Sequence, residues 1–115
     1  MANEAVVKPI IIHDEENQKD YTLEFNRDTV KFAESRGFYI NDVEKYPMTK
    51  LPELFWYAFR MHHPNMSRAN TDKIFFEDLG GINDKVANRL GELYAAPYEA
   101  MNGAERKNPN MTVEL

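Results

Sequence analysis

The side chains with the greatest capacity for chemistry are the histidines and the carboxylates. His62 and His63 are neighbours, so on a helix their side chains point about 100° apart. Two histidines that bind zinc from one helix face are spaced i, i+4, and this pair is not. The acidic run Asp14, Glu15, Glu16 lacks the ligand spacing and the central glycine of a calcium loop. We therefore expect no metal site.

The remaining polar motifs form no catalytic or cofactor-binding pattern. The stretch DLGGIND, residues 78–84, holds paired glycines but not the lysine of a phosphate-binding loop. Ser35 and Ser67 are not matched by a histidine and an acid in a recognisable nucleophile motif. Glu77 and Asp78 are adjacent and diverge on a helix, which indicates solvated charge. We expect a protein that is not an enzyme and that uses no cofactor.

The charge balance argues against a nucleic-acid-binding protein. The formal net charge is −5, whereas nucleic-acid binders gain much of their affinity when Lys and Arg neutralise phosphates. One local cluster is basic, and it consists of Arg60, His62, His63 and Arg68. Acidic residues follow closely at positions 72, 77 and 78. We expect no nucleic-acid partner.

Length, hydropathy and cysteine content narrow the class further. The 115 residues suffice for one domain with a single core. No apolar run approaches the ~20 residues that span a bilayer, and the first residues, MANEAVVKPIII, lack the basic segment and cleavage site of a signal peptide. The absence of cysteine suits a reducing compartment. These features predict a cytoplasmic protein with no membrane partner.

The elements that must position any binding surface begin with a hairpin over residues 6–25. Residues 6–12 and 21–25 are rich in β-branched and aromatic side chains, and the second run alternates apolar and polar residues as a half-buried strand does. The polar residues 13–20 should connect the two strands in solvent. Pro9 cannot donate to a ladder, so regular pairing should begin after it or the strand should lie at an edge. Because two strands alone are marginal in water, the hairpin must pack on helices or pair with a neighbouring subunit.

Capping and breaking residues predict the first helices. Asn26 should cap a helix that Gly37 ends, with Phe38 folded back on its last turn. Asn41 should open a short turn of helix that Pro47 stops.

The next helix has the clearest periodicity in the chain. It should begin at a Thr49 cap, hold Pro52 in its first turn and end before Pro64. Its apolar stripe comprises Leu51, Leu54, Phe55, Ala58, Phe59 and His62. We expect this stripe to form the core.

Two further helices complete the predicted bundle. Ser67 should cap a helix ending at Gly80, with Ile74, Phe75 and Leu79 in the core and Phe76 nearer the edge. Asn83 should open another that buries Val86, Leu90, Leu93 and Tyr94, and Pro97 should end or kink it before a last short helix.

The resulting fold class is α+β, mostly α, with an N-terminal β-hairpin packed on a bundle of four to five short helices. Residues 1–103 should form a single globular domain, with the hairpin at 6–25 and the helical part at 26–103. Residues 104–115 are polar and should form a mobile tail.

Three aromatic residues lie off the predicted core stripe. Trp56 and Tyr57 follow the stripe residue Phe55, and Phe76 follows Phe75. The simpler interpretation is that helix 49–63 is packed on all sides. The alternative is that Trp56, Tyr57 and Phe76 contact a partner or a second subunit, since exposed aromatic residues dominate protein interfaces. We take these three as the partner-binding candidates.

Three strings in this order carry a resemblance to a known family. They are LEFNRDTVKFAESRGF at 23–38, LPELFWYAFRMHHP at 51–64 and TDKIFFEDLGG at 71–81. Over residues 21–101 the chain resembles the small tail assembly chaperones of long-tailed, siphovirus-type bacteriophages. These strings are typical of a family and are not a catalytic fingerprint.

The resemblance implies a non-catalytic function. Such a chaperone binds the tape measure protein and keeps it soluble while the tail tube assembles around it, in the host cell cytoplasm and not in the mature virion. The major tail protein is a second candidate partner, and self-association into a homo-oligomer is a rival use of the same surface. The alternatives are a small phage or bacterial protein-binding regulator and, less favoured, a DNA-binding helical domain.

Overall fold

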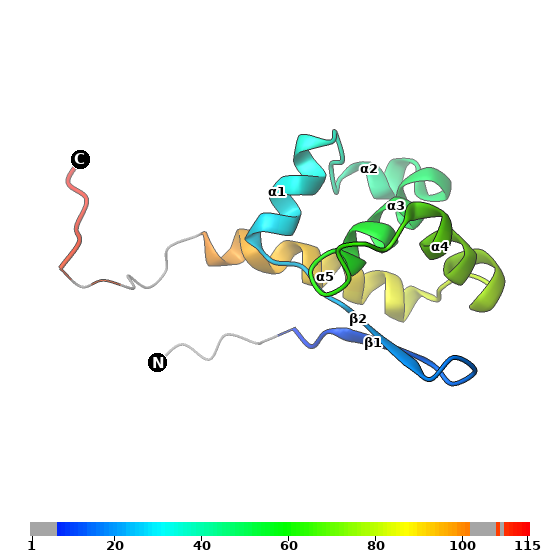
Figure 1. Cartoon of the computed structure of the whole chain (residues 1–115). Coiled ribbons are helices and arrows are strands. Elements are labelled where there is room, and N and C mark those ends of the chain that lie inside the picture. Colours follow the sequence, from blue (N-terminus) through cyan, green and yellow to red (C-terminus); the bar gives the residue numbers. More distant parts are fainter. Residues whose placement is uncertain (1–6, 102–107, 109) are drawn as a thin grey trace.

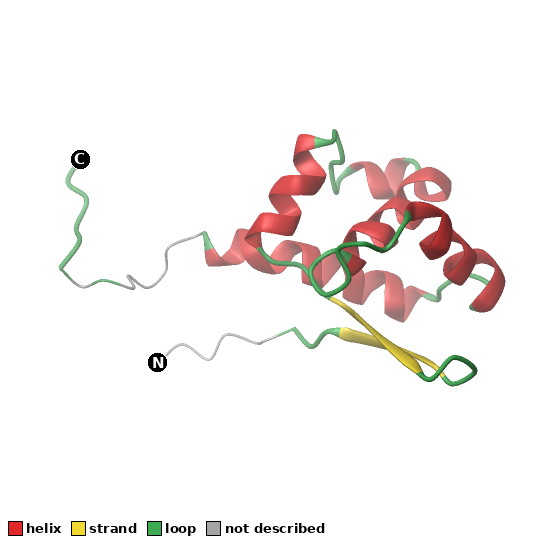
Figure 2. Cartoon of the chain, in the orientation of Figure 1, coloured by secondary structure: helices red, strands yellow, loops and turns green. Residues whose placement is uncertain are grey.

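A computed structural model describes residues 7–101, 108 and 110–115. The fold is α+β and mostly α, as predicted: a two-stranded antiparallel hairpin precedes a set of helices (Figures 1 and 2). The elements are β1 (Ile10–Asp14), β2 (Lys19–Leu23), α1 (Arg27–Ser35), α2 (Asp42–Lys45), α3 (Pro47–Phe59), α4 (Arg68–Lys73), the π-helix η1 (Ile74–Asp78) and α5 (Asp84–Ala100).

Some predictions fall on residues outside this description. They concern both ends of the predicted domain, at 1–6 and 102–103, the first position of the predicted strand 6–12, and positions 104–107 and 109 of the predicted tail. The described tail residues 108 and 110–115 are exposed and form neither helix nor strand. The mobility of this tail stays a prediction.

The hairpin forms where predicted, but its connection is shorter. Pairing begins at Ile10, directly after Pro9, and continues through His13 opposite Asp20 to Asp14 opposite Lys19. Only residues 15–18 remain as the turn, so the predicted connection 13–20 is wrong at both ends. The ladder continues into this polar region, where a cross-strand pair between His13 Nδ1 and Asp20 Oδ1 at 2.8 Å supports it.

The second strand ends earlier than predicted, at Leu23, because its backbone turns to the helices. The N–H of Glu24 donates to the carbonyl of Ala58 at 3.0 Å, and the N–H of Thr22 donates to Nε2 of His63 at 3.0 Å. Leu23 and Phe25 are buried beneath. The outer edge of β2 is therefore covered by the end of α3 and the turn that follows it.

Helix α1 has the ends that the sequence predicts. The side chain of Asn26 accepts from the N–H of Thr29 at 2.9 Å, and the Thr29 hydroxyl accepts from the N–H of Asn26 at 2.8 Å. Gly37 ends the helix with φ +85°, a conformation that a side chain disfavours. Phe38 folds back so that its N–H reaches the carbonyl of Ala33 at 3.0 Å.

The two predicted helix starts in the middle of the chain have different outcomes: α2 begins directly after Asn41, as predicted, whereas the predicted start of α3 is wrong. Asn41 precedes α2, but its side chain makes no capping bond. Helix α3 begins at Pro47 and not after Thr49, because proline at the first helical position has its φ preset and needs no donor there. Pro52 therefore lies well inside α3, where it removes the donor for the carbonyl of Met48.

The predicted stripe on α3 forms the centre of the core. Leu54, Phe55, Ala58 and Phe59 are all buried. The ring of Phe55 packs edge-on against Phe59 at 5.1 Å and against Phe75 at 5.2 Å between centroids. His62 is exposed, contrary to the prediction, because α3 ends at Phe59 and the chain turns away from the stripe.

The predicted helix from Ser67 to Gly80 is two segments. Ser67 caps α4 by accepting from the N–H of Asn70 at 3.1 Å. The chain then widens into η1, whose end is marked by Leu79 donating to the carbonyl of Ile74 at 2.8 Å. Ile74 and Phe75 are buried as predicted, but Leu79 is 45% exposed and is not in the core, because it lies at the end of η1 where the chain leaves the other helices.

The last two predicted helices are one. Asn83 caps α5 by accepting from the N–H of Val86 at 2.9 Å, and the helix continues through Pro97 to Ala100. A proline removes one hydrogen bond, here to the carbonyl of Leu93, and the following residues keep their helical pairing. Leu90, Leu93 and Tyr94 are buried, whereas Val86 is only half-buried.

Replacing the central phenylalanine rings by alanine should destabilise the protein. Phe55→Ala and Phe59→Ala are each expected to lower the free energy of unfolding by ~3–5 kcal/mol, since both remove a fully buried ring. Urea denaturation followed by circular dichroism measures this. Phe76→Ala is the matched control, because Phe76 is exposed and should change stability by under ~1 kcal/mol. Losses below ~1 kcal/mol at both core positions would contradict this placement.

Tyr94 carries a polar atom that the core does not use. Its ring packs edge-on against Phe25 at 5.0 Å and Phe38 at 5.7 Å. Among the residues that the structure describes, no group bonds its buried hydroxyl. Burial, and then the neighbouring Glu34 and Tyr57, raise the pKa of Tyr94 to about 12.

Two substitutions should therefore distinguish the effect of the Tyr94 ring on stability from that of its hydroxyl. Tyr94→Phe is expected to keep or raise the free energy of unfolding, by up to ~1 kcal/mol, because it removes a desolvated hydroxyl and keeps the ring. Tyr94→Ala should cost ~3–5 kcal/mol. A loss above ~1 kcal/mol for Tyr94→Phe in the same denaturation experiment would mean that the hydroxyl is bonded in solution.

Candidate protein-binding surfaces

Each of the three histidines makes its own structural contact. His13 pairs with Asp20 across the hairpin. His62 Nε2 lies 2.8 Å from Oε1 of Glu24, and His63 accepts from the backbone of β2. Within residues 7–101, 108 and 110–115, no group of three His, Asp or Glu side chains is arranged to hold a metal ion. In the same residues, no helix is both long and apolar enough to span a bilayer.

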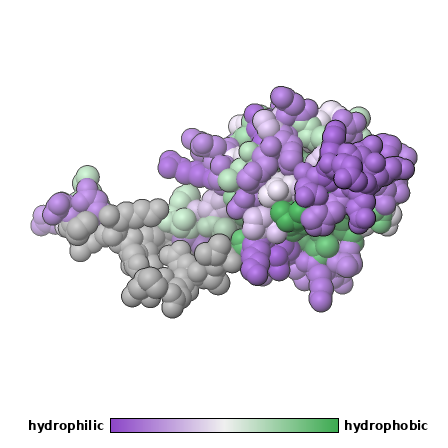
Figure 3. Space-filling model, turned by 60° about the horizontal axis from the view of Figure 1, so that its bottom comes forward, coloured by the Kyte–Doolittle hydropathy of each residue, from purple (hydrophilic) through white to green (hydrophobic). Residues whose placement is uncertain are grey.

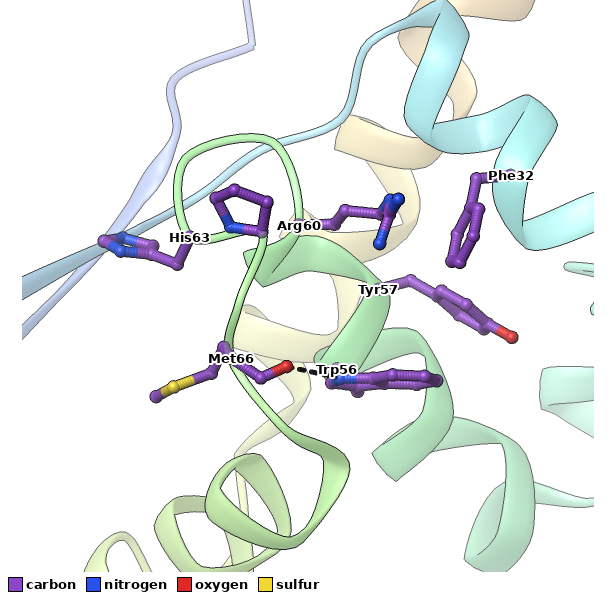
Figure 4. A pocket seen from close by; sticks show the side chains of 7 residues that line it. Phe32, Trp56, Tyr57, Arg60, His63 and Met66 are labelled. Carbon is purple, nitrogen blue, oxygen red and sulfur yellow. Dashed lines mark hydrogen bonds between the residues drawn. The ribbon is translucent and has the colours of Figure 1, made fainter.

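Trp56 and Tyr57 lie together but differ in exposure. Trp56 is half-buried, and its Nε1 donates to the carbonyl of Met66 at 3.0 Å (Figure 4). Tyr57 is only 4% exposed, and its ring packs against Phe38 at 5.3 Å and Phe32 at 6.1 Å. Tyr57 is therefore a core residue and cannot present its ring to a partner.

Arginines cover the aromatic rings beside Trp56. The guanidinium of Arg60 lies 3.6 Å from the ring centroid of Phe32 (Figure 4), and that of Arg36 lies 5.5 Å from Phe32 and 5.9 Å from Trp56. Such cation–π contacts stabilise the packing of α1 on α3. The sequence places Arg60 in a basic cluster and does not reveal its contact with Phe32, because the two residues belong to distant segments. Only the i, i+4 spacing of Phe32 and Arg36 was a visible signal for such a contact.

The cavity at this cluster is too small for a ligand. It encloses about 30 Å³ between Phe32, Trp56, Arg60 and Met66, which suits a water molecule and is far below the volume of a small-molecule site. Figure 4 shows His63 at its margin, directed toward the hairpin and away from the rings. The cluster is therefore a packing contact between α1 and α3 and not a ligand-binding site.

Phe76 is the exposed member of the three partner candidates. It is 55% exposed and packs edge-on against the buried Phe75 at 4.7 Å. Its neighbour Leu79 is also exposed. The widened turn of η1 places both residues at the end of the molecule formed by α4 and η1. Inserted turns of this kind are frequent at functional sites.

A groove beside η1 joins this segment to the hairpin. It has a volume of about 360 Å³, and we call it the hairpin groove. Its apolar lining residues are Ile12, Tyr21, Ile74 and Leu79, and its acidic ones are Asp14, Glu15, Glu16 and Asp78. The sequence does not reveal this groove, because its two walls are about 60 residues apart in the chain.

The charges of the hairpin groove are predominantly negative. Lys73 is held by Asp78, with Nζ 3.1 Å from Oδ1, and this bond raises the pKa of Lys73. Hydrogen bonds from Asn17 lower the pKa of Asp14 and keep it ionised. A groove with apolar walls and an acidic rim suits an apolar segment that carries basic residues.

Comparison with known proteins assigns a family but no function. A family model described as "Domain of unknown function (DUF5055)" matches residues 1–115, so the chain belongs to that family. No curated protein and no solved structure matches the chain.

His63 ties the helices to β2 only in its neutral form. Its Nε2 accepts from the N–H of Thr22, and a protonated Nε2 could not accept. Burial, and then the charge of His62, lower the pKa of His63. Between the folded and unfolded pKa values, the unfolded state binds more protons, so stability rises with pH across that window. The stabilisation that neutral His63 contributes is complete above pH ~6.5, the pKa of an unfolded histidine, and is lost as the pH falls through the folded pKa.

Acidification from pH 7 toward pH 5 should therefore lower the free energy of unfolding. His63→Gln is expected to make this decrease smaller, because the titrating group is gone. His13→Gln is the comparison, since it removes the exposed histidine at the hairpin end and leaves the bond between His63 and Thr22 in place. Urea denaturation at several pH values measures the slope, and equal slopes for wild type and His63→Gln would contradict the assignment.

Proposed function

We propose that this DUF5055 protein is a non-catalytic tail assembly chaperone that binds the phage tape measure protein and keeps it soluble during tail tube assembly. One observation carries the proposal: the string at residues 71–81, among the most specific parts of the resemblance, covers the end of α4 and all of η1, with exposed Phe76. The chain thus places an aromatic side chain outside its core at a position that the resemblance marks.

The hairpin groove supplies a binding mode for this function. Phe76 and Leu79 are exposed on and just after η1, and Leu79 also lines the groove. An amphipathic helical segment of the tape measure protein would place its apolar side on Ile12 and Ile74 and its basic residues at the acidic rim. Each such contact is weak, and repeated contacts along a long polypeptide raise the overall affinity. The net charge of −5 keeps the chaperone soluble.

The proposal includes activity in the host cell cytoplasm and absence from the mature virion, both of which the resemblance implies. The major tail protein is a further proposed partner, since tube subunits meet the tape measure protein at the same time. A general protein-binding regulator would use the same groove with another partner. Binding to tape measure fragments in preference to unrelated helical proteins distinguishes the two functions.

A DNA-binding function receives little support from the basic cluster. Arg60 stacks on Phe32, and Arg68 Nε bonds Asp72 Oδ1 at 2.9 Å. His62 pairs with Glu24. These contacts occupy the side chains that would have to reach phosphates, so salt-dependent DNA binding is not expected.

Co-expression with fragments of the tape measure protein from the same genome tests the proposal. The wild-type protein is expected to keep these fragments soluble and to co-purify with them. Phe76→Ser should weaken binding about tenfold, as loss of an aromatic contact does. Tyr39→Ser is the matched control, because Tyr39 is 56% exposed and Phe76 is 55% exposed, and Tyr39 lies between α1 and α2 and not in the α4–η1 segment.

Two results would count against this proposal in different ways. If the wild-type protein retains no tape measure fragment, the function is wrong. If Tyr39→Ser loses binding and a folded Phe76→Ser variant retains it, the function stands and the assigned surface is wrong. Circular dichroism of each variant establishes that the fold is retained.

A further inference from the structure

The outer edge of β1 is open, in contrast to that of β2. Thr22 and Glu24 direct their N–H groups away from β1, to His63 and Ala58. Thr22 is paired with Ile11 in the ladder, so Ile11 and, two residues on, His13 direct their backbone groups away from β2. Among the described residues, none makes a backbone hydrogen bond to these groups.

This edge is also apolar. Ile11 is 45% exposed on the outer face, and its neighbours Ile10 and Ile12 are half-buried against the core. Figure 1 shows the hairpin along the lower border of the molecule, with the helices on its other side. In Figure 3, which brings this side forward, hydrophobic side chains gather in a patch between polar regions. An exposed apolar edge strand is a template for pairing with another strand.

We propose that a second copy of this chain pairs with β1 in an antiparallel arrangement, so that two hairpins form one four-stranded sheet across a two-fold axis. The register sets Ile11 opposite Ile11 of the second copy. Ile10 of each copy then faces Ile12 of the other, and Lys8 of each copy faces Asp14 of the other.

Charge complementarity selects this register. Lys8 and Asp14 are the charged residues at the two ends of the segment 8–14, and only the register centred on Ile11 places each opposite the other. Opposite charges that face each other across strands stabilise the pairing, and like charges destabilise it. A shift by two residues would set Lys8 or Asp14 against an isoleucine.

Pro9 is compatible with this register and limits the pairing. Its carbonyl can accept from the N–H of His13 of the second copy, although it has no N–H to donate in return. Because the interface uses the same segment on both subunits, it closes after two copies and does not grow into a filament. The inference rests on the backbone edge of β1 and not on the proposed chaperone function. Ile12 and Asp14 also line the hairpin groove, but association in the absence of a tape measure fragment tests the pairing alone.

The association state in solution tests the inference. Analytical ultracentrifugation is expected to show a concentration-dependent dimer for the wild-type protein. Ile11→Lys should weaken this dimer at least about tenfold, because it removes the central apolar contact and opposes two like charges. Met48→Lys is the control: Met48 is 90% exposed, it lies on α3 away from β1, and its replacement should leave the dimer unchanged.

A charge exchange tests the register itself. Lys8→Glu and Asp14→Lys should each weaken the dimer about tenfold, because each variant sets like charges opposite one another twice. A mixture of the two variants should restore it, because every pair in the heterodimer is again of opposite charge. Light scattering of the separate and mixed samples measures this, with circular dichroism as the check that each variant is folded.

Several outcomes would overturn the inference. A wild-type protein that stays monomeric up to ~1 mM would exclude a dimer of useful affinity. A dimer that survives Ile11→Lys, or that Met48→Lys disrupts instead, would place the interface elsewhere. Folded Lys8→Glu and Asp14→Lys variants that do not associate when mixed, beside a wild-type dimer, would exclude this register.

Discussion

The backbone edge of β2 is the constraint on which the rest of the structure depends. A two-stranded hairpin is marginal in water, and here the outer edge of β2 is held by two hydrogen bonds to the end of α3 and the turn beyond it, at Ala58 and His63. These bonds form only because α3 ends at Phe59 and the chain turns back toward β2. The hairpin, the core stripe and the turn are thus one cooperative unit, in which helix ends replace a third strand.

This unit decides which surfaces remain for binding. Most of the aromatic side chains near α3 pack on one another, and arginines cover Phe32 and Trp56. The position of the hairpin sets two of the accessible surfaces, because the hairpin forms one wall of the acidic hairpin groove and presents the outer edge of β1. Both surfaces suit extended or helical polypeptides, and neither is an enclosed pocket of the kind that small substrates occupy.

The partner candidates show what the apolar periodicity of a helix can and cannot predict about burial. Trp56, Tyr57 and Phe76 all lie off the apolar stripe, but only Phe76 is largely exposed. Tyr57 is buried because α1 and Phe38 cover the second side of α3. A stripe identifies one buried side of a helix, and it does not count the neighbours that pack on the other sides. The groove between hairpin and η1 was beyond sequence analysis for the same reason.

The sequence by itself determined the features that depend on a few neighbouring residues. The caps at Asn26, Ser67 and Asn83, the stop at Gly37 and the start of pairing after Pro9 are local, because each is a hydrogen bond or a dihedral restriction within a few positions. Only the tertiary structure decided the continuation of α5 through Pro97, the burial of Tyr57 and the closure of one hairpin edge but not the other. These depend on packing between distant segments, whose energy outweighs local preference and leaves no periodic trace in the chain.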